Sequence, residues 1–216
     1  MPELSFHVEG AEVVAFAAIP QIALKLAISN GQPDEPIHTV ALRCQIQIEA
    51  TRRRYTAEEQ EKLLDLFGEP DRWSQTLRSL LWTHASVVVP AFSGNTLVDL
   101  PVPCTFDFNA AATKYFYGLE SGDLPLCLQF SGTVFYAGAD GGLQVAPISW
   151  DKEARYKLPV KVWRKMMDSY YPNSAWLCLR RDVVERLYQY KVRHGIPTWE
   201  EALESVLPPV EEAVGK

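Results

Sequence analysis

The sequence is poor in the residues that bind metals or form disulfides. Its 216 residues include only four cysteines and four histidines. The cysteines, Cys44, Cys104, Cys127 and Cys178, lie far apart, without the Cys-x-x-Cys pairs or nearby histidines typical of zinc sites. Three of them occupy apolar positions in strand-like segments, so we expect buried, reduced thiols in a cytoplasmic protein. We predict no bound cofactor.

Long apolar segments and an excess of positive charge are also absent. No stretch approaches the roughly 18 apolar residues that cross a membrane, and the first ten residues do not resemble a secretory signal. The 21 Lys and Arg residues against 27 Asp and Glu residues give a formal net charge of −6. An acidic chain of this kind is not expected to bind nucleic acid through bulk electrostatics.

The common catalytic motifs are missing as well. Ser93-Gly94-Asn95 is typical of a turn, not of a Gly-x-Ser-x-Gly nucleophile elbow. The glycine-rich segment 138–142 lacks the Lys-Ser/Thr ending of a phosphate loop and favours a hairpin turn. Asp123, Asp140 and Asp151 could meet at one end of a sandwich and bind calcium, but their loops lack the usual Asp/Asn alternation. We therefore predict that the protein is not an enzyme.

What the sequence does contain is enough apolar residues, 47% of the chain with six Trp, for one sizeable core. Two segments, 22–29 and 40–49, alternate apolar and polar residues with a period of two. This alternation is typical of a half-buried strand, because successive side chains of a strand point to opposite faces. Asn30, Gly31, Pro33 and Pro36 between them favour a turn. The two segments are predicted to pair as antiparallel strands.

Further alternating segments predict a mainly β fold with an α appendage. They lie at 4–8, 86–89, 102–108, 126–136 and 143–148. Their spacing, without a strand–helix–strand rhythm, favours an antiparallel β-sandwich of about seven to nine strands. We predict that this sandwich occupies residues 1–150.

Two regions have helical patterns. The first is a helical crossover insertion at about 56–82, which opens with a capping box formed by Thr56 and Glu59. The second is residues 151–216, predicted to form two or three C-terminal helices packed on the sandwich as a helical appendage. There, the apolar spacing of residues 160–170 predicts a helix, Asp182 is a candidate cap for the next, and Thr198 opens the last.

The charges of this C-terminal region are polarised. Residues 180–194 contain five basic and two acidic side chains, a formal +3, whereas residues 199–212 contain five glutamates, a formal −5. One interpretation is a solvated helix pair that is partly paired with itself. The other is a docking face for a partner protein, because Tyr, Trp and Arg are enriched at interface hot spots. The residues of this predicted docking face are Arg180, Arg181, Arg186, Tyr188, Tyr190, Arg193 and Trp199.

Several segments resemble an uncharacterised actinobacterial protein family over most of the chain. They are 19–30, 42–46, 179–182, 186–188, 190–191, 193–194 and 197–199. Genes of that family often lie beside those for a high-affinity uptake NiFe-hydrogenase. The resemblance implies an accessory or maturation-associated role, with hydrogenase subunits or maturation factors as partners. It implies no catalytic residues.

These observations leave three hypotheses about function. The first is a non-enzymatic cytoplasmic accessory protein that docks a partner protein through its C-terminal helices and assists hydrogenase assembly or maturation. The second is a chaperone-like adaptor that binds extended polypeptide segments at a sheet edge, for which the Pro-interrupted region 86–101 is the candidate. The third is a small-molecule-binding or metal-binding β-sandwich. The sequence leaves the oligomeric state open.

Overall fold

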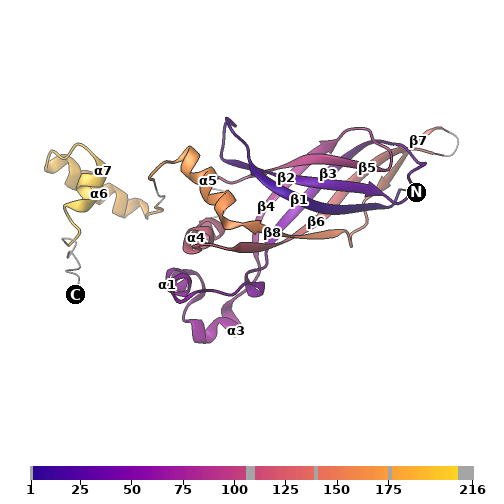
Figure 1. The fold of residues 1–216 in the computed structure, drawn as a ribbon. Coiled ribbons are helices and arrows are strands. Elements are labelled where there is room, and N and C mark those ends of the chain that lie inside the picture. The colour runs from indigo at the N-terminus through magenta and orange to yellow at the C-terminus, as the bar shows by residue number, and fades with distance from the viewer. Residues whose placement is uncertain (1, 106–109, 139–140, 175–176, 209–216) are drawn as a thin grey trace. The chain divides into compact units, whose positions relative to one another are not determined.

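The computed structural model describes residues 2–105, 110–138, 141–174 and 177–208. The chain divides into two compact units, residues 1–174 and residues 175–216. The first unit is built on two antiparallel sheets with helices at one end (Figure 1). The predicted antiparallel β-sandwich with helical additions is thereby confirmed.

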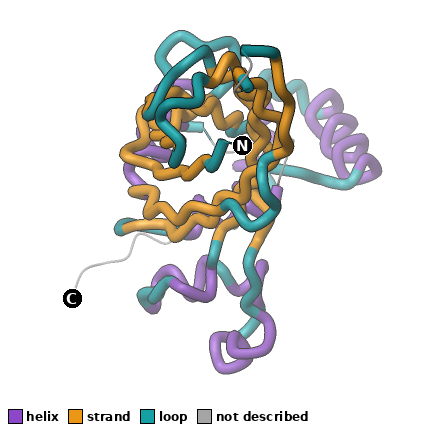
Figure 2. Tube along the Cα trace, turned by 90° about the vertical axis from the view of Figure 1, so that its right-hand side faces the viewer, coloured by secondary structure: helices purple, strands orange, loops and turns teal. Residues whose placement is uncertain are grey.

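The two sheets face each other across one apolar core (Figure 2). The smaller sheet has the order β1-β2-β5, and the larger has the order β4-β3-β6-β7. Strand β8 pairs with the first half of β6, whereas β7 pairs with its second half. The strands are β1 (Leu4–Val13), β2 (Gln21–Asn30), β3 (Ile37–Ile48), β4 (Leu80–Val89), β5 (Asn95–Pro103), β6 (Asp123–Ala137), β7 (Leu143–Pro147) and β8 (Glu153–Pro159).

The period-two alternation correctly identified the buried faces. Ile22, Leu24, Leu26 and Ile28 of β2 are all completely buried. Across the core, the ring of Phe6 in β1 stacks on that of Phe130 in β6, with 4.2 Å between the ring centroids. The apolar faces of the two sheets are buried against each other, and this burial supplies the main driving force for folding.

The predicted pairing of segments 22–29 and 40–49 is wrong. β2 pairs with β1 and β5, whereas β3 pairs with β4 and β6, so the two strands belong to different sheets. The alternation shows which side chains face the core, but both sheets present an apolar face to that core. The pattern therefore did not determine the hydrogen-bonding partner of either strand.

Asn30 holds the connection that carries the chain from one sheet to the other. Its side-chain amide donates to the carbonyls of Gln32 and Glu35 at 2.7 and 3.1 Å. Its Oδ1 accepts from the backbone N–H groups of Glu3 and Gln32 at 3.2 and 3.1 Å. The side chain is buried, so these bonds satisfy polar groups that water does not reach.

The helical insertion joins β3 to its neighbour β4. It comprises η1 (Ala50–Arg52), α1 (Ala57–Lys62), α2 (Leu64–Phe67), η2 (Pro70–Arg72) and α3 (Trp73–Thr76). The predicted capping box of Thr56 and Glu59 is present in both directions. The insertion ends earlier than predicted, because β4 begins at Leu80. Leu80 and Leu81 continued the apolar spacing of a helix, but they pair with Ile48 and Gln47 of β3.

Two helices pack at the same end of the first unit, α4 (Ala110–Gly118) and α5 (Val160–Tyr170). Trp163 of α5 stacks on Phe116 of α4, with ring centroids 4.8 Å apart. The sequence placed residues 151–160 in the helical appendage, yet β8 is a strand of the larger sheet. Its alternation of charged residues with Ala154, Tyr156 and Leu158 is a strand pattern that the sequence analysis missed.

Two other predictions fall partly outside the described residues. The strand predicted at 102–108 corresponds to β5, which begins at Asn95 and ends at Pro103, while residues 106–109 are outside the described part. The turn predicted at 138–142 includes residues 139–140, which are also outside it. The hairpin that this turn connects is present, because β7 pairs with the end of β6.

The second unit contains α6 (Arg181–Arg193) and α7 (Trp199–Glu204), which contact each other. Together with α5 they make three helices, within the predicted two or three; the packing of α6 and α7 on the sandwich stays a prediction. Arg180, not Asp182, is the N-cap of α6 and makes no side-chain capping bond. Thr198 caps α7 as predicted, accepting from the N–H of Glu201 at 3.2 Å. None of the described helices has the length and apolar character to cross a membrane.

The cysteines are free thiols, three buried and one exposed. Burial raises the pKa of Cys44 and of Cys104 to about 12, so almost no reactive thiolate forms at pH 8. We expect a thiol reagent at pH 8 to modify the exposed Cys178 rapidly, and Cys44 and Cys104 only after unfolding. Intact-mass spectrometry over time measures this, and Cys178→Ser should remove the fast phase. Fast labelling of that variant would contradict the burial of the other thiols.

Candidate functional site

The predicted docking residues all lie in the second unit, but on different parts of it. Arg186, Tyr190 and Arg193 line a hollow of about 440 Å³ on α6. Its remaining lining is Val183, Leu187, Gln189 and Val206. The hollow thus combines apolar side chains with two guanidinium groups, and within the described residues neither Arg186 nor Arg193 has an ion-pair partner.

Tyr190 is held within this hollow by its neighbours. Its hydroxyl accepts a hydrogen bond from Ser205 Oγ at 3.2 Å, which links α6 to the end of α7. Its ring also lies against that of His194, with centroids 4.2 Å apart. Two contacts of this kind reduce the rotamer freedom of Tyr190, and a fixed aromatic side chain loses less entropy when a partner binds.

Tyr188 and Trp199 lie outside the hollow. Their ring centroids are 6.2 Å apart, and Lys191 Nζ lies 5.8 Å from the centroid of the Trp199 ring. Arg180 pairs with Asp182 at 2.9 Å, and both side chains are exposed. The seven predicted residues therefore form two groups plus the basic start of α6, and their role in docking stays a prediction.

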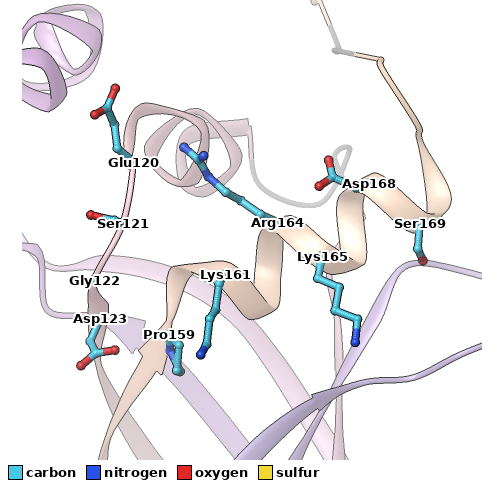
Figure 3. A pocket seen from close by; sticks show the side chains of 10 residues that line it. All are labelled: Glu120, Ser121, Gly122, Asp123, Pro159, Lys161, Arg164, Lys165, Asp168 and Ser169. Atoms are coloured by element: carbon cyan, nitrogen blue, oxygen red, sulfur yellow. The ribbon is translucent and has the colours of Figure 1, made fainter.

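A second candidate site, which the sequence analysis missed, lies in the first unit. It is an open groove of about 900 Å³ between the loop 119–123 and α5. Figure 3 shows Arg164 extending from α5 towards the loop, while Lys161 and Lys165 both project from the other side of the helix. The loop contributes Glu120, Ser121, Gly122 and Asp123, and α5 also contributes Asp168 and Ser169.

The loop 119–123, which forms one wall of this groove, is bound by a buried ion pair. Arg53 Nη2 lies 2.5 Å from Glu59 Oε1, and the two side chains are only 8% and 2% exposed. Arg53 also donates to the carbonyls of Ser121 and Asp123 at 2.7 and 2.8 Å. Glu59 accepts from the N–H of Glu120 at 2.9 Å. The insertion thus fixes the loop through its main chain.

The other side of the loop is bound by α5. Arg164 donates to the carbonyl of Leu119, and the N–H of Val160 donates to the carbonyl of Gly122 at 2.9 Å. The loop is consequently restrained by two separate parts of the chain, the helical insertion and α5. A wall restrained in this way has a fixed main chain, and a rigid support is a property that binding sites require.

Hydrogen bonding and burial alter the ionisation of groups around the groove. Lys62 donates to Glu120 at 2.7 Å, and this hydrogen bond lowers the pKa of the Glu120 carboxyl. Behind the loop, the hydroxyls of Tyr55 and Tyr115 lie 2.6 Å apart. Burial raises the pKa of Tyr55 to about 12 and also raises that of Tyr115, so both are neutral at pH 7. Because carboxylates and amino groups both line the groove, it suits a polar ligand.

The structure also bears on the candidate calcium site of Asp123, Asp140 and Asp151. Asp123 lines the groove, and Asp140 lies outside the described residues. Within the described part of the chain, no three His, Cys, Asp or Glu side chains are arranged to hold a metal ion.

The sequence offered only partial signals for the groove. Thr56 and Glu59 were identified as a capping box, and Arg53 was one of three consecutive arginines after β3. Nothing in this pattern indicated that Arg53 alone of the three turns inwards. The partners of Arg53 and Glu59 lie about sixty residues along the chain, at 120–123.

Two solved structures show distant similarity to this chain. A protein assigned as late embryogenesis abundant shares 15% identity, with 74% of this chain and 72% of that chain covered and a TM-score of 0.30. A protein from Bordetella pertussis assigned as ApaA shares 14% identity, with 73% and 93% covered and a TM-score of 0.23. TM-scores this low carry no argument about function.

Comparison with protein families is more informative. A search of curated proteins finds no match. The model of the family of unknown function DUF6084, in contrast, matches residues 1–214. A match over nearly the whole length defines membership, and the chain belongs to the DUF6084 family.

Proposed function

We propose that the protein is a non-enzymatic binding protein that docks a partner protein through the hollow on α6. One observation carries this proposal: Arg186 and Arg193 flank an apolar hollow, and within the described residues neither has an ion-pair partner. Arginines in this position offer planar groups with several donors, which suit carboxylates. The spacing of seven residues places both on one side of the helix.

The hollow defines the chemistry of the partner. Its apolar lining, including Val183, Leu187 and Val206, accepts one or two small apolar side chains. Its two arginines can each pair with a carboxylate of the partner, next to the apolar side chains. We therefore propose a partner segment that combines carboxylates with an apolar residue. Tyr190, held by Ser205, serves as a fixed aromatic contact in the lining of the hollow.

We further propose that this docking assists the assembly or maturation of an uptake NiFe-hydrogenase. The support is the resemblance described in the sequence analysis, which makes hydrogenase subunits and maturation factors the first candidate partners. We place this action in the cytoplasm, because the described thiols are unpaired, as is usual in a reducing compartment.

Reversing the two arginine charges is expected to abolish partner capture. With Arg186→Glu and Arg193→Glu together, an acidic partner segment meets repulsion, and we expect at least about 30-fold weaker binding. The full chain is immobilised, a host extract is passed over it, and bound hydrogenase subunits are quantified by mass spectrometry. Binding constants are then measured with the purified partner.

The matched control carries the same two changes elsewhere. Arg72→Glu and Arg78→Glu reverse two exposed arginines of the helical insertion region and should leave capture unchanged. Equal capture by the wild type and the α6 variant would refute docking at the hollow. Loss of capture in both variants would show that capture depends on the net charge of the protein and not on the hollow.

A second candidate function, ligand binding by the sandwich, is supported by the groove between the loop 119–123 and α5. Carboxylates of the loop and amino groups of Lys161 and Lys165 line this groove, so a zwitterionic or otherwise polar small molecule would suit it. The chaperone-like alternative requires a free sheet edge within 86–101. There the edges of β4 and β5 contact each other, which leaves less room for an added strand.

A further inference from the structure

α6 carries a second apolar surface that is separate from the hollow. Val184, Tyr188 and Val192, spaced by four residues, are 40%, 55% and 60% exposed. Trp199, 42% exposed, lies beside Tyr188. Residues at this spacing line one face of a helix, so they form a continuous apolar stripe. We call Val184, Tyr188, Val192 and Trp199 the α6 stripe.

The unit that carries this stripe is too small to be stable with so little buried. Within the described residues, α6 has no buried side chain, and α7 buries only Ala202. Two short helices gain most of their stability from packing an apolar face, and units of about 40 residues usually need further support. The α6 stripe therefore requires a cover.

The order of residues along the stripe indicates what covers it. Val184 and Val192 lie at equal distances on either side of Tyr188, so the stripe reads the same in both directions. In an antiparallel pair of identical helices centred on Tyr188, Val184 of one copy lies opposite Val192 of the other. A twofold interface has this self-complementary property, in which residue i contacts j and j contacts i.

The charges of the hairpin favour the same arrangement. α6 begins with Arg180 and Arg181, whereas α7 begins with Glu200 and Glu201 beside the other end of α6. Among the described residues, no ion pair joins α6 to α7 within one chain. When two α6 helices pair in antiparallel orientation, the N-terminal arginines of α6 in one copy lie level with the N-terminal glutamates of α7 in the other.

We propose that the α6 stripe binds a second copy of this chain, so that two α6–α7 hairpins form an antiparallel, twofold-symmetric helical assembly. The proposal extends the proposed function, because it assigns a partner to the other surface of the same hairpin. It uses different residues from the hollow around Arg186, Tyr190 and Arg193, which stays accessible to another protein.

Sedimentation velocity of the full chain over a range of concentrations tests the apolar contact. The wild type is expected to move from a 24.3 kDa monomer to a dimer as concentration rises. Val192→Asp buries a charge at the contact and is expected to raise the dissociation constant at least about 30-fold. Val145→Asp, on an equally exposed valine of β7, should leave it unchanged.

A charge exchange tests the antiparallel arrangement. One variant carries Arg180→Glu and Arg181→Glu, and the other carries Glu200→Lys and Glu201→Lys. Each alone places like charges together and is expected to weaken self-association at least about 10-fold. An equimolar mixture restores both attractive contacts, so native mass spectrometry should detect the heterodimer in preference to either homodimer. Circular dichroism verifies that both variants keep their helices.

The outcomes separate this inference from the proposed function. A wild type that stays monomeric at all concentrations, or a mixture that forms no heterodimer, overturns the second copy as partner. Dimers that survive both Val192→Asp and the charge variants overturn it too, because the contact then lies elsewhere. If hydrogenase capture still depends on Arg186 and Arg193, the proposed function stands alone; if it does not, both fail.

Discussion

Replacing Gly132 by alanine is expected to destabilise the sandwich by about 3–5 kcal/mol, from backbone strain and steric overlap together. Gly132 lies in β6, the strand that pairs with β3 on one side and with β7 and β8 on the other. Its φ of +140° is one that residues with a side chain rarely adopt. A Cβ atom there would lie 2.1 Å from the carbonyl oxygen of Ala41.

No side-chain movement can relieve this overlap, because the obstructing atom belongs to the main chain of β3. Ala41 also pairs with both β4 and β6, so shifting its carbonyl would disturb the larger sheet on both sides. The strand would have to bend away, and the bond from Ile148 N–H to the carbonyl of Gly132, 3.0 Å long, would be strained.

Urea unfolding followed by tryptophan fluorescence measures the effect. Gly141→Ala is the matched control, since Gly141 also has a positive φ, +76°, but no atom within 4 Å of the added Cβ. We expect a loss of about 1 kcal/mol there, from the backbone alone. Equal stabilities of the two variants would contradict the close approach of β6 to β3.

Removing the carboxylate of Glu59 is expected to destabilise the first unit by about 3–5 kcal/mol, the usual range when one partner of a buried ion pair is lost. The charge of Arg53, only 8% exposed, would then stay buried without its counterion. The N–H groups of Thr56 and Glu120 would lose their acceptor as well. The loop 119–123 should become more mobile, which would remove one wall of the groove.

The comparison of Glu59→Ala with Arg53→Met and with the double variant measures this coupling. Unfolding free energies come from urea titration, and hydrogen exchange reports on the loop. Because the double variant leaves no unpaired charge, its loss should be smaller than the sum of the two single losses. Lys62→Ala, which breaks the exposed pair with Glu120, should change stability little. Additive losses would show that Arg53 and Glu59 act independently.

Much of the fold could be predicted from local patterns. The alternation in β2 and β3 identified their buried faces, and Thr56 and Thr198 marked helix starts that the structure contains. These predictions succeed because a period of two or a capping residue reflects the geometry of a few neighbouring residues. Such signals do not depend on the rest of the chain.

The two candidate sites differ in the same way: one is formed by residues close in sequence, and the other by residues far apart. The predicted docking residues of α6 and α7 stand out in the sequence because charges and aromatic side chains cluster within about 20 residues, and their role in docking stays a prediction. The groove could not be identified in this way, since Arg53 and Glu59 of the insertion and Arg164 of α5 meet the loop 119–123 from segments far apart in the sequence. Three consecutive arginines after β3 look equivalent in the sequence, and only the position of the loop distinguishes Arg53.

The sequence by itself determined the class of the fold: strands with one apolar face, a helical insertion and two or three C-terminal helices. Only the tertiary structure decided which strands pair, that β2 and β3 belong to different sheets, and that β8 completes the larger one. The physical reason is that burial is specified residue by residue, through hydrophobicity. Hydrogen bonds between strands, in contrast, join main-chain groups that are the same in nearly every residue, so their partners depend on how the whole chain packs.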